Sequence, residues 1–211
     1  RLGASAPEVN GRAQIDILAL SGGGSDGAFG AGVLAGWTAR GDRPEFEHVT
    51  GVSAGSIIAP FAFLGSDYDD KVKEIWTHYN TDQLVVPQIL NGLFGGEAIA
   101  DTSPLKKLVA QYVDRNFLKK IAAEYERGRL LPIGTTNLDA KRPVVWNMGA
   151  IARHYDDPDA VQLFRDVIIA SAAIPGLFPP VNIKVEVDGK IYDEMHVDGG
   201  PTREVFLAPT D

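Results

Sequence analysis

The sequence of 211 residues contains no cysteine, which excludes disulfide bonds and thiolate metal sites. No apolar run approaches the roughly 18 residues of a membrane-spanning helix. Basic residues are outnumbered, with 20 Lys and Arg against 28 Asp and Glu, so the net charge is −8. This charge argues against nucleic acid as a partner and against binding to anionic membranes by charge alone. The four histidines have no spacing to carboxylates that is typical of metal ligands, so we expect no metal and no other cofactor.

The composition is that of a globular protein, and the length suits one domain with a substantial core. Residues 1–14 are polar and irregular, and we expect an N-terminal arm or linker there. We expect residues 15–211 to form the folded domain. The sequence is also consistent with a domain that is truncated at its C-terminal end. The chain opens on Arg1. If a leader or anchor precedes it, the protein is secreted, periplasmic or lipid-anchored, and otherwise it is cytoplasmic.

The first elements alternate between strand and helix. Residues 15–20 favour a strand, residues 21–30 form a glycine-rich loop, and residues 28–40 favour a helix. A second strand over 48–52 and a second helix after Ser53 follow. This order predicts right-handed crossovers and a largely parallel sheet. Because small and apolar residues surround most of helix 28–40, we expect that helix to be buried.

Further elements follow in the second half of the chain. Helical patterns cover about 68–80, 103–112, 115–127 and 159–173, and strand patterns cover 130–136 and 143–147. Strands 181–187 and 190–197 flank Asp188-Gly189, a strong hairpin signal. Pro60 lies within the helix after Ser53, and it predicts a kink or an early break near residues 56–60.

The central motif is Gly51-Val52-Ser53-Ala54-Gly55, which joins the second strand to its helix. A serine on such a sharp turn projects its hydroxyl away from the backbone, and the glycines let the chain bend tightly. The N–H groups at the start of the helix also point toward charge formed beside the serine. The motif therefore indicates Ser53 as a nucleophile, with Gly51 and Gly55 shaping the turn.

The glycine-rich loop allows two interpretations. Successive N–H groups of Gly22, Gly23 and Gly24 can converge on an oxyanion or a phosphate. Gly22, Gly24 and Gly27 also fit a dinucleotide-binding spacing, with Glu47 as the ribose-binding acid. That acid should stand at the end of the second strand, but Ser53 occupies this region and Glu47 precedes the strand. The order favours an oxyanion loop beside a serine.

The third motif is Asp198-Gly199-Gly200, which follows the last predicted strand. An aspartate at a strand end is well placed to face a crevice at the edge of the sheet. His196 lies two residues earlier and therefore on the same face of the strand. A Ser-His-Asp triad that uses His196 is thus an alternative to a direct pairing of serine with aspartate.

These three motifs, in this order, resemble those of the patatin-like phospholipases. The resemblance covers roughly residues 15–200 and extends to three further stretches, Asp101–Leu105, Thr135–Asp139 and Ala170–Pro180. It implies a three-layer α/β/α fold with a central, mostly parallel sheet, so that 15–211 is the catalytic domain. It also implies a Ser53–Asp198 dyad, with Gly22, Gly23 and Gly24 as the oxyanion loop.

The resemblance implies a serine hydrolase that cleaves acyl esters of lipids, of the phospholipase A, lysophospholipase or carboxylesterase type. Its partner would be a lipid or a membrane interface, not nucleic acid. One departure is Asp26, because many family members carry Arg or Lys at that position. An acid there weakens the positive potential of the loop, unless Asp26 caps the following helix. A catalytically silent lipid-binding module is the second alternative.

The stretch 84–96 is rich in apolar residues and glycine and lacks a clear period. Long irregular segments in compact domains are usually functional or disordered. Two interpretations follow: a mobile apolar flap over the Ser53 crevice, in which Leu93 and Phe94 contact the lipid substrate, or a loop that packs in the core.

Overall fold

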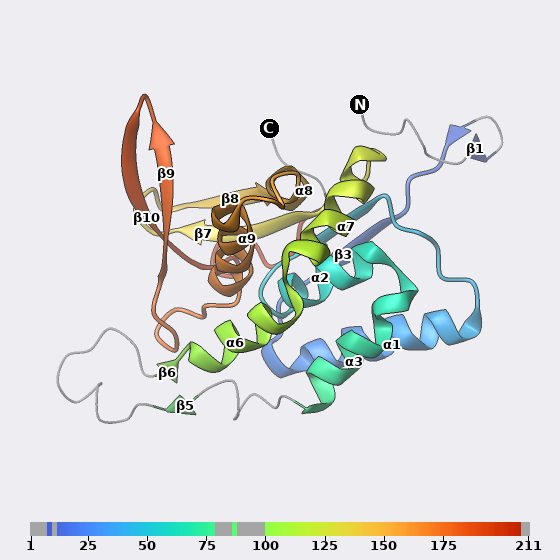
Figure 1. The fold of residues 1–211 in the computed structure, drawn as a ribbon. Helices are drawn as coiled ribbons and strands as arrows, with labels where there is room; N and C mark the ends of the chain where they lie inside the picture. Colours follow the sequence, from blue (N-terminus) through green and yellow to red (C-terminus); the bar gives the residue numbers. More distant parts are fainter. Residues whose placement is uncertain (1–7, 10–11, 79–85, 88–99, 208–211) are drawn as a thin grey trace.

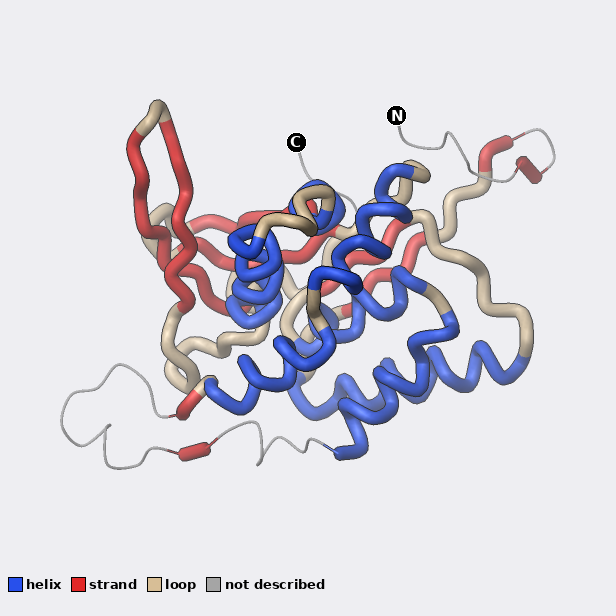
Figure 2. The backbone as a smooth tube through the Cα atoms, in the orientation of Figure 1, coloured by secondary structure: helices blue, strands red, loops and turns tan. Residues whose placement is uncertain are grey.

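The structure, a computed structural model, describes residues 8–9, 12–78, 86–87 and 100–207. A six-stranded sheet and the helices that flank it form the body of the protein (Figures 1 and 2). The strands of this sheet are β3 (Ile17–Leu20), β4 (His48–Gly51), β7 (Pro132–Asn137), β8 (Arg142–Asn147), β9 (Val181–Val187) and β10 (Lys190–Asp198). The helices are α1 (Gly27–Arg40), α2 (Ala54–Leu64), α3 (Asp69–His78), α6 (Ser103–Tyr112), α7 (Arg115–Glu126), α8 (Met148–Ala152) and α9 (Pro158–Ser171).

The sheet is mixed, with the order β3-β4-β7-β10-β9 and with β8 also paired to β7. Strands β3, β4 and β7 are parallel to one another. Strands β8 and β10 pair with β7 in antiparallel orientation, and β9 extends the sheet beyond β10 in the same way. Together with the flanking helices this confirms the α/β class and the α/β/α arrangement expected from the sequence.

The parallel part of the sheet is built from the predicted strand–helix alternation. All four residues of β4 are buried, as expected for a strand covered on both faces. Helix α2 packs on β4 and is buried at ten of its eleven residues, which explains its continuous apolar sequence. Because β4 and α2 lie at the centre of the fold, the turn between them is held rigidly.

The predicted early break of the helix at Pro60 is wrong. Helix α2 continues through Pro60 to Leu64. Proline inside a helix costs about 3 kcal/mol. The side chains of α2 belong to the main hydrophobic core, and tertiary packing of this kind supplies most helix stability in proteins. Burial of the whole helix therefore outweighs the local cost.

The expectation that helix 28–40 is buried all round is also wrong. Only Gly27, Ala31 and Leu34 of α1 are buried. On another side of the helix Phe29 is 78% exposed and Val33 is 46% exposed. The apolar sequence suggested burial, but α1 packs on α3 and α2 with one face only.

Other expectations are confirmed with small shifts of boundary. The 181–197 hairpin forms, and Asp188 and Gly189 at its turn have φ values of 52° and 74°, as in the predicted two-residue turn. The hairpin projects beyond the body of the molecule (Figure 1). The arm contains a short antiparallel ladder between β1 (Glu8–Val9) and β2 (Arg12–Ala13). A second one joins β5 (Val86–Pro87) to β6 (Ala100–Asp101). Short 3-10 turns cover Gly24–Asp26 and Ser66–Tyr68.

Most of the predicted flap, including Leu93 and Phe94, lies outside the described residues. Among the helices of the described ranges, none has both the length and the apolar character that a membrane span requires.

Candidate active site

The site lies where strands β4 and β10 end against the same edge of β7. Strand β8 occupies the other edge of β7 along its whole length. On the shared edge Gly51, the last residue of β4, pairs with Ile133, and Asp198, the last residue of β10, pairs with Thr135. Since β4 is parallel to β7 and β10 is antiparallel to it, their C-terminal ends face each other. This topology brings together two residues that are far apart in the sequence.

Ser53 occupies the sharp turn between β4 and α2. Its backbone has φ 54° and ψ −126°, a conformation that is uncommon for a residue with a side chain and that costs about 1–3 kcal/mol. Tight packing forces this turn. A Cβ atom on Gly55 would lie 2.3 Å from the carbonyl oxygen of Leu20, so only glycine fits where α2 passes the end of β3. The surrounding structure thus holds Ser53 in a strained backbone conformation, as in a nucleophile elbow.

The strained turn is tied down by Ser171 at the end of α9. The Ser53 N–H donates a hydrogen bond to the Ser171 hydroxyl at 3.0 Å. The same hydroxyl donates to the carbonyl oxygen of Gly134 on β7 at 2.7 Å. Ser171 is fully buried, and its side chain therefore links the turn to the central strand.

Asp198 is also buried, with 4% of its surface exposed. Its carboxyl group accepts a hydrogen bond from the Gly200 N–H at 2.8 Å. Burial raises the pKa of Asp198 above its ordinary value, and the nearby Ser53 hydroxyl and the Gly200 N–H offset part of this rise. When ionised, the carboxylate is therefore a stronger base than an exposed aspartate.

The glycine loop lies directly beside the serine. A Cβ atom on Gly22 would be 3.1 Å from Ser53 Cβ and 3.7 Å from Ser53 Oγ. Gly23 and Gly24 have φ values of 154° and 55°, which permit this sharp loop before α1. Within the described part of the chain, the N–H groups of Gly22, Gly23 and Gly24 donate no hydrogen bond. The loop thus offers unpaired donors close to Ser53.

His196 is fully buried in a separate network. Its Nδ1 atom lies 3.0 Å from the hydroxyl of Thr135, which also accepts a hydrogen bond from the Trp146 indole N–H at 2.8 Å. Its Nε2 atom lies 3.3 Å from a carboxylate oxygen of Glu194. Burial lowers the pKa of His196, and Glu194 offsets part of this decrease. Both ring nitrogens are engaged with residues other than Ser53 and Asp198.

The comparisons with known proteins agree with this geometry. Residues 18–209 match the family model of the patatin-like phospholipases. The chain belongs to this family. Its members are lipid acyl hydrolases. The structure is similar to that of VipD from Legionella pneumophila, with a TM-score of 0.53 and 15% sequence identity over 92% of this chain. The aligned part is 47% of the VipD chain, so this patatin-like chain spans about half the length of that protein. A search of curated proteins found no match.

Two cavities border the site. The larger, of about 610 Å³, lies at the glycine loop and is walled by apolar side chains of Leu20, Phe29 and Ile58, together with Gly22 and Gly23. Asp26 also lines it and is the only ionisable residue among the described residues of its wall. The Asp26 side chain makes no capping bond to α1, so the capping role considered for it is wrong.

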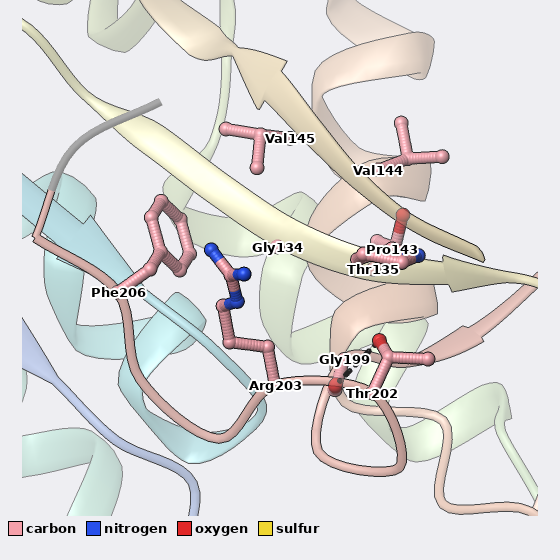
Figure 3. Close-up of a pocket in the computed structure, with 9 residues that line it drawn as sticks. All are labelled: Gly134, Thr135, Pro143, Val144, Val145, Gly199, Thr202, Arg203 and Phe206. Carbon is pink, nitrogen blue, oxygen red and sulfur yellow. Dashed lines mark hydrogen bonds between the residues drawn. The ribbon is translucent and has the colours of Figure 1, made fainter. Parts of the chain in front are cut away.

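The smaller cavity, of about 200 Å³, lies between β7 and the C-terminal segment (Figure 3). Its wall includes Gly199, which follows Asp198, and Gly134, which accepts the hydrogen bond from Ser171. The Arg203 side chain extends into it beside the ring of Phe206 (Figure 3). Ser53 and Asp198 line neither of these two cavities.

The structure thus brings together the predicted Ser53, Asp198 and Gly22–Gly24, with Gly51 and Gly55 at the turn. It separates Glu47 from this group, because the Glu47 carboxylate accepts a hydrogen bond from the Asp16 N–H at the opposite end of β3 and β4. Ser171 was not singled out from the sequence. Its position in the stretch 170–180 that resembles the family was the available signal.

Proposed function

We propose that this protein hydrolyses acyl esters of lipids through Ser53 as nucleophile and Asp198 as general acid and base. The observation that carries the proposal is the meeting of β4 and β10 on one edge of β7. It sets the Ser53 hydroxyl against a buried carboxylate, next to unpaired N–H groups of the glycine loop. Such an arrangement of nucleophile, base and oxyanion donors supports acyl transfer.

In the first half of the reaction, the Asp198 carboxylate takes the proton of Ser53 as Oγ attacks the ester carbonyl carbon. The oxyanion that develops accepts hydrogen bonds from Gly23 and Gly24, with Gly22 beside it. The bond to the leaving alcohol then breaks, and Asp198 returns the proton to the departing oxygen. Water completes the cycle: it gives a proton to Asp198 and attacks the acyl carbon, and Ser53 leaves with that proton as the fatty acid is released.

The raised pKa of Asp198 supports this role, because a carboxylate at its reference pKa of about 3.9 is a weak base. Two alternatives compete. A triad through His196 would need a ring nitrogen between Ser53 and Asp198, whereas both ring nitrogens contact other groups. A silent lipid-binding module would keep the fold without turnover.

A fluorophosphonate probe and a panel of phospholipid, lysophospholipid and glyceride substrates test the proposal. We expect covalent labelling of the wild type and none of Ser53→Ala, with loss of ester hydrolysis in Ser53→Ala and in Asp198→Ala. Circular dichroism should show that both variants remain folded. Hydrolysis by Asp198→Ala at most of the wild-type rate, with loss in His196→Ala, would establish the triad instead. Absence of both labelling and turnover in the wild type would favour the binding module.

A further inference from the structure

Helix α1 carries an apolar face that no described residue covers. This α1 strip consists of Phe29, Gly32, Val33 and Gly36, which recur every three or four residues and so share one side of the helix. All four are exposed, Phe29 at 78%. A Cβ atom placed on Gly32 or Gly36 would meet no atom within 4 Å, so the space over the strip is open.

The strip contains no charge. Between Gly27 and Ala39 the sequence of α1 has no ionisable residue, and Arg40 at its end pairs with Asp42. Exposed helix faces in globular proteins are normally polar or charged. An uncharged face on a protein with a net charge of −8 therefore calls for a partner that is itself apolar.

The strip is continuous with the site. Phe29 lies in the first turn of α1, next to the glycine loop, and also forms part of the wall of the 610 Å³ cavity there. Its ring thus belongs both to the outer surface and to the space beside Gly22 and Gly23. A lipid that contacts the strip at Phe29 therefore lies within about one helical turn of the glycine loop.

We propose that the α1 strip is the surface on which this protein contacts a lipid interface, with Phe29 and Val33 inserted among the acyl chains. The inference rests on the proposed function, since a lipid interface on the α1 strip would hold the ester substrate beside the same site. A second copy of the chain fits less well. The strip between Phe29 and Gly36 is only about 10 Å long, whereas a stable dimer buries about 800 Å² on each partner.

The experiment compares vesicle binding with turnover of a soluble ester. Val33→Gln/Gly36→Gln makes the strip polar without altering a residue of the site, and glutamine has a higher helix propensity than valine or glycine. Gly36→Leu enlarges the strip instead. Ile191→Gln is the matched control, because Ile191 is 71% exposed on the distant β9–β10 hairpin. Flotation with phosphatidylcholine vesicles is measured in a Ser53→Ala background, and hydrolysis of a short-chain soluble ester is measured with Ser53 intact.

We expect about tenfold weaker vesicle binding for Val33→Gln/Gly36→Gln and about tenfold stronger binding for Gly36→Leu, since one buried aliphatic side chain accounts for a change of this size. Ile191→Gln should bind like the parent protein. Binding should not weaken in high salt, and soluble-ester turnover should be unchanged in all three variants.

Equal vesicle binding of the glutamine variant and its parent would overturn the inference. So would a loss of thermal stability in that variant, which would mean that another part of the chain covers the strip. Self-association that the glutamine substitutions abolish, without vesicle binding, would assign the strip to a second copy and also refute it. Failure of the wild type to hydrolyse any ester would instead refute the proposed function, and it would leave the flotation result as a separate measurement.

Discussion

Replacement of Ser171 by alanine tests whether the strained turn at Ser53 depends on the buried hydrogen bond to the Ser171 hydroxyl. The substitution removes the acceptor of the Ser53 N–H and the donor to the Gly134 carbonyl in one step. Ser53 is 7% exposed and Ser171 is fully buried, so water does not readily replace the lost hydroxyl. Each buried group left without a partner costs about 1–3 kcal/mol. We therefore expect the free energy of unfolding to fall by about 2–6 kcal/mol.

The same change should reduce catalysis beyond its effect on stability. The backbone of Ser53 is strained, with φ at 54°, and the bond to Ser171 is one of the contacts that hold it there. A displacement of about 1 Å in a reacting group can lower the rate about a hundredfold. We expect a loss of this order in kcat with little change in KM, because the groups that bind the lipid are not altered.

Urea unfolding and the kinetics of a soluble ester below the unfolding transition measure both effects. Ser56→Ala is the matched control. Its hydroxyl is equally buried and donates to the Ser53 carbonyl at 2.6 Å, but that carbonyl also accepts the Ser56 N–H at 2.9 Å. Removal of this hydroxyl leaves no orphaned carbonyl, and we expect a loss of only about 1 kcal/mol. If Ser171→Ala loses no more stability than Ser56→Ala and keeps its kcat, the tether does not hold the turn.

Four further predictions concern titration and the buried network. Asp198→Asn should lower the rate of ester hydrolysis by at least about a thousandfold. It should also raise the free energy of unfolding at pH 7, because the folded-state pKa of Asp198 is raised and its ionised form destabilises the fold at higher pH; a less stable variant in urea would contradict this. The acidic limb of kcat/KM should have its midpoint above the usual aspartate pKa of about 3.9, and a pH–rate profile that stays flat down to this value would refute Asp198 as the base. His196→Gln should keep more than about a tenth of the activity at pH 7. The wild type should lose stability as the pH falls below about 6.5, because burial lowers the pKa of His196 and His48, and the slope measured by urea unfolding should be smaller in His196→Gln.

The glycine motifs made the turn at Ser53 predictable from the sequence. Gly51 and Gly55 stand between a strand pattern and an apolar helix pattern. Two glycines in this position have few physical explanations other than a tight strand–helix turn. The alternation of strands and helices likewise determined the parallel arrangement of β3 and β4. These features depend on local chain geometry, and the local sequence therefore contains them.

Features that depend on several distant segments were not predictable in this way. Helix α2 passes through Pro60 because its packing in the core outweighs the local preference of proline. The sequence of α1 indicated burial, yet the described elements that pack on it, mainly α2 and α3, leave one side of the helix exposed. In both cases the energy of tertiary packing decides the outcome, and the residue pattern along one segment does not specify that packing.

The sequence by itself determined the α/β class, the turn that presents Ser53 and the glycine loop beside it, since each rests on residues that are adjacent in the chain. The tertiary structure decided that Asp198, rather than His196 or Glu47, lies against Ser53. The physical reason is that β4 and β10 share one edge of β7 and end facing each other. The same long-range packing placed the Ser171 hydroxyl against the backbone N–H of Ser53, 118 residues away from it in the sequence.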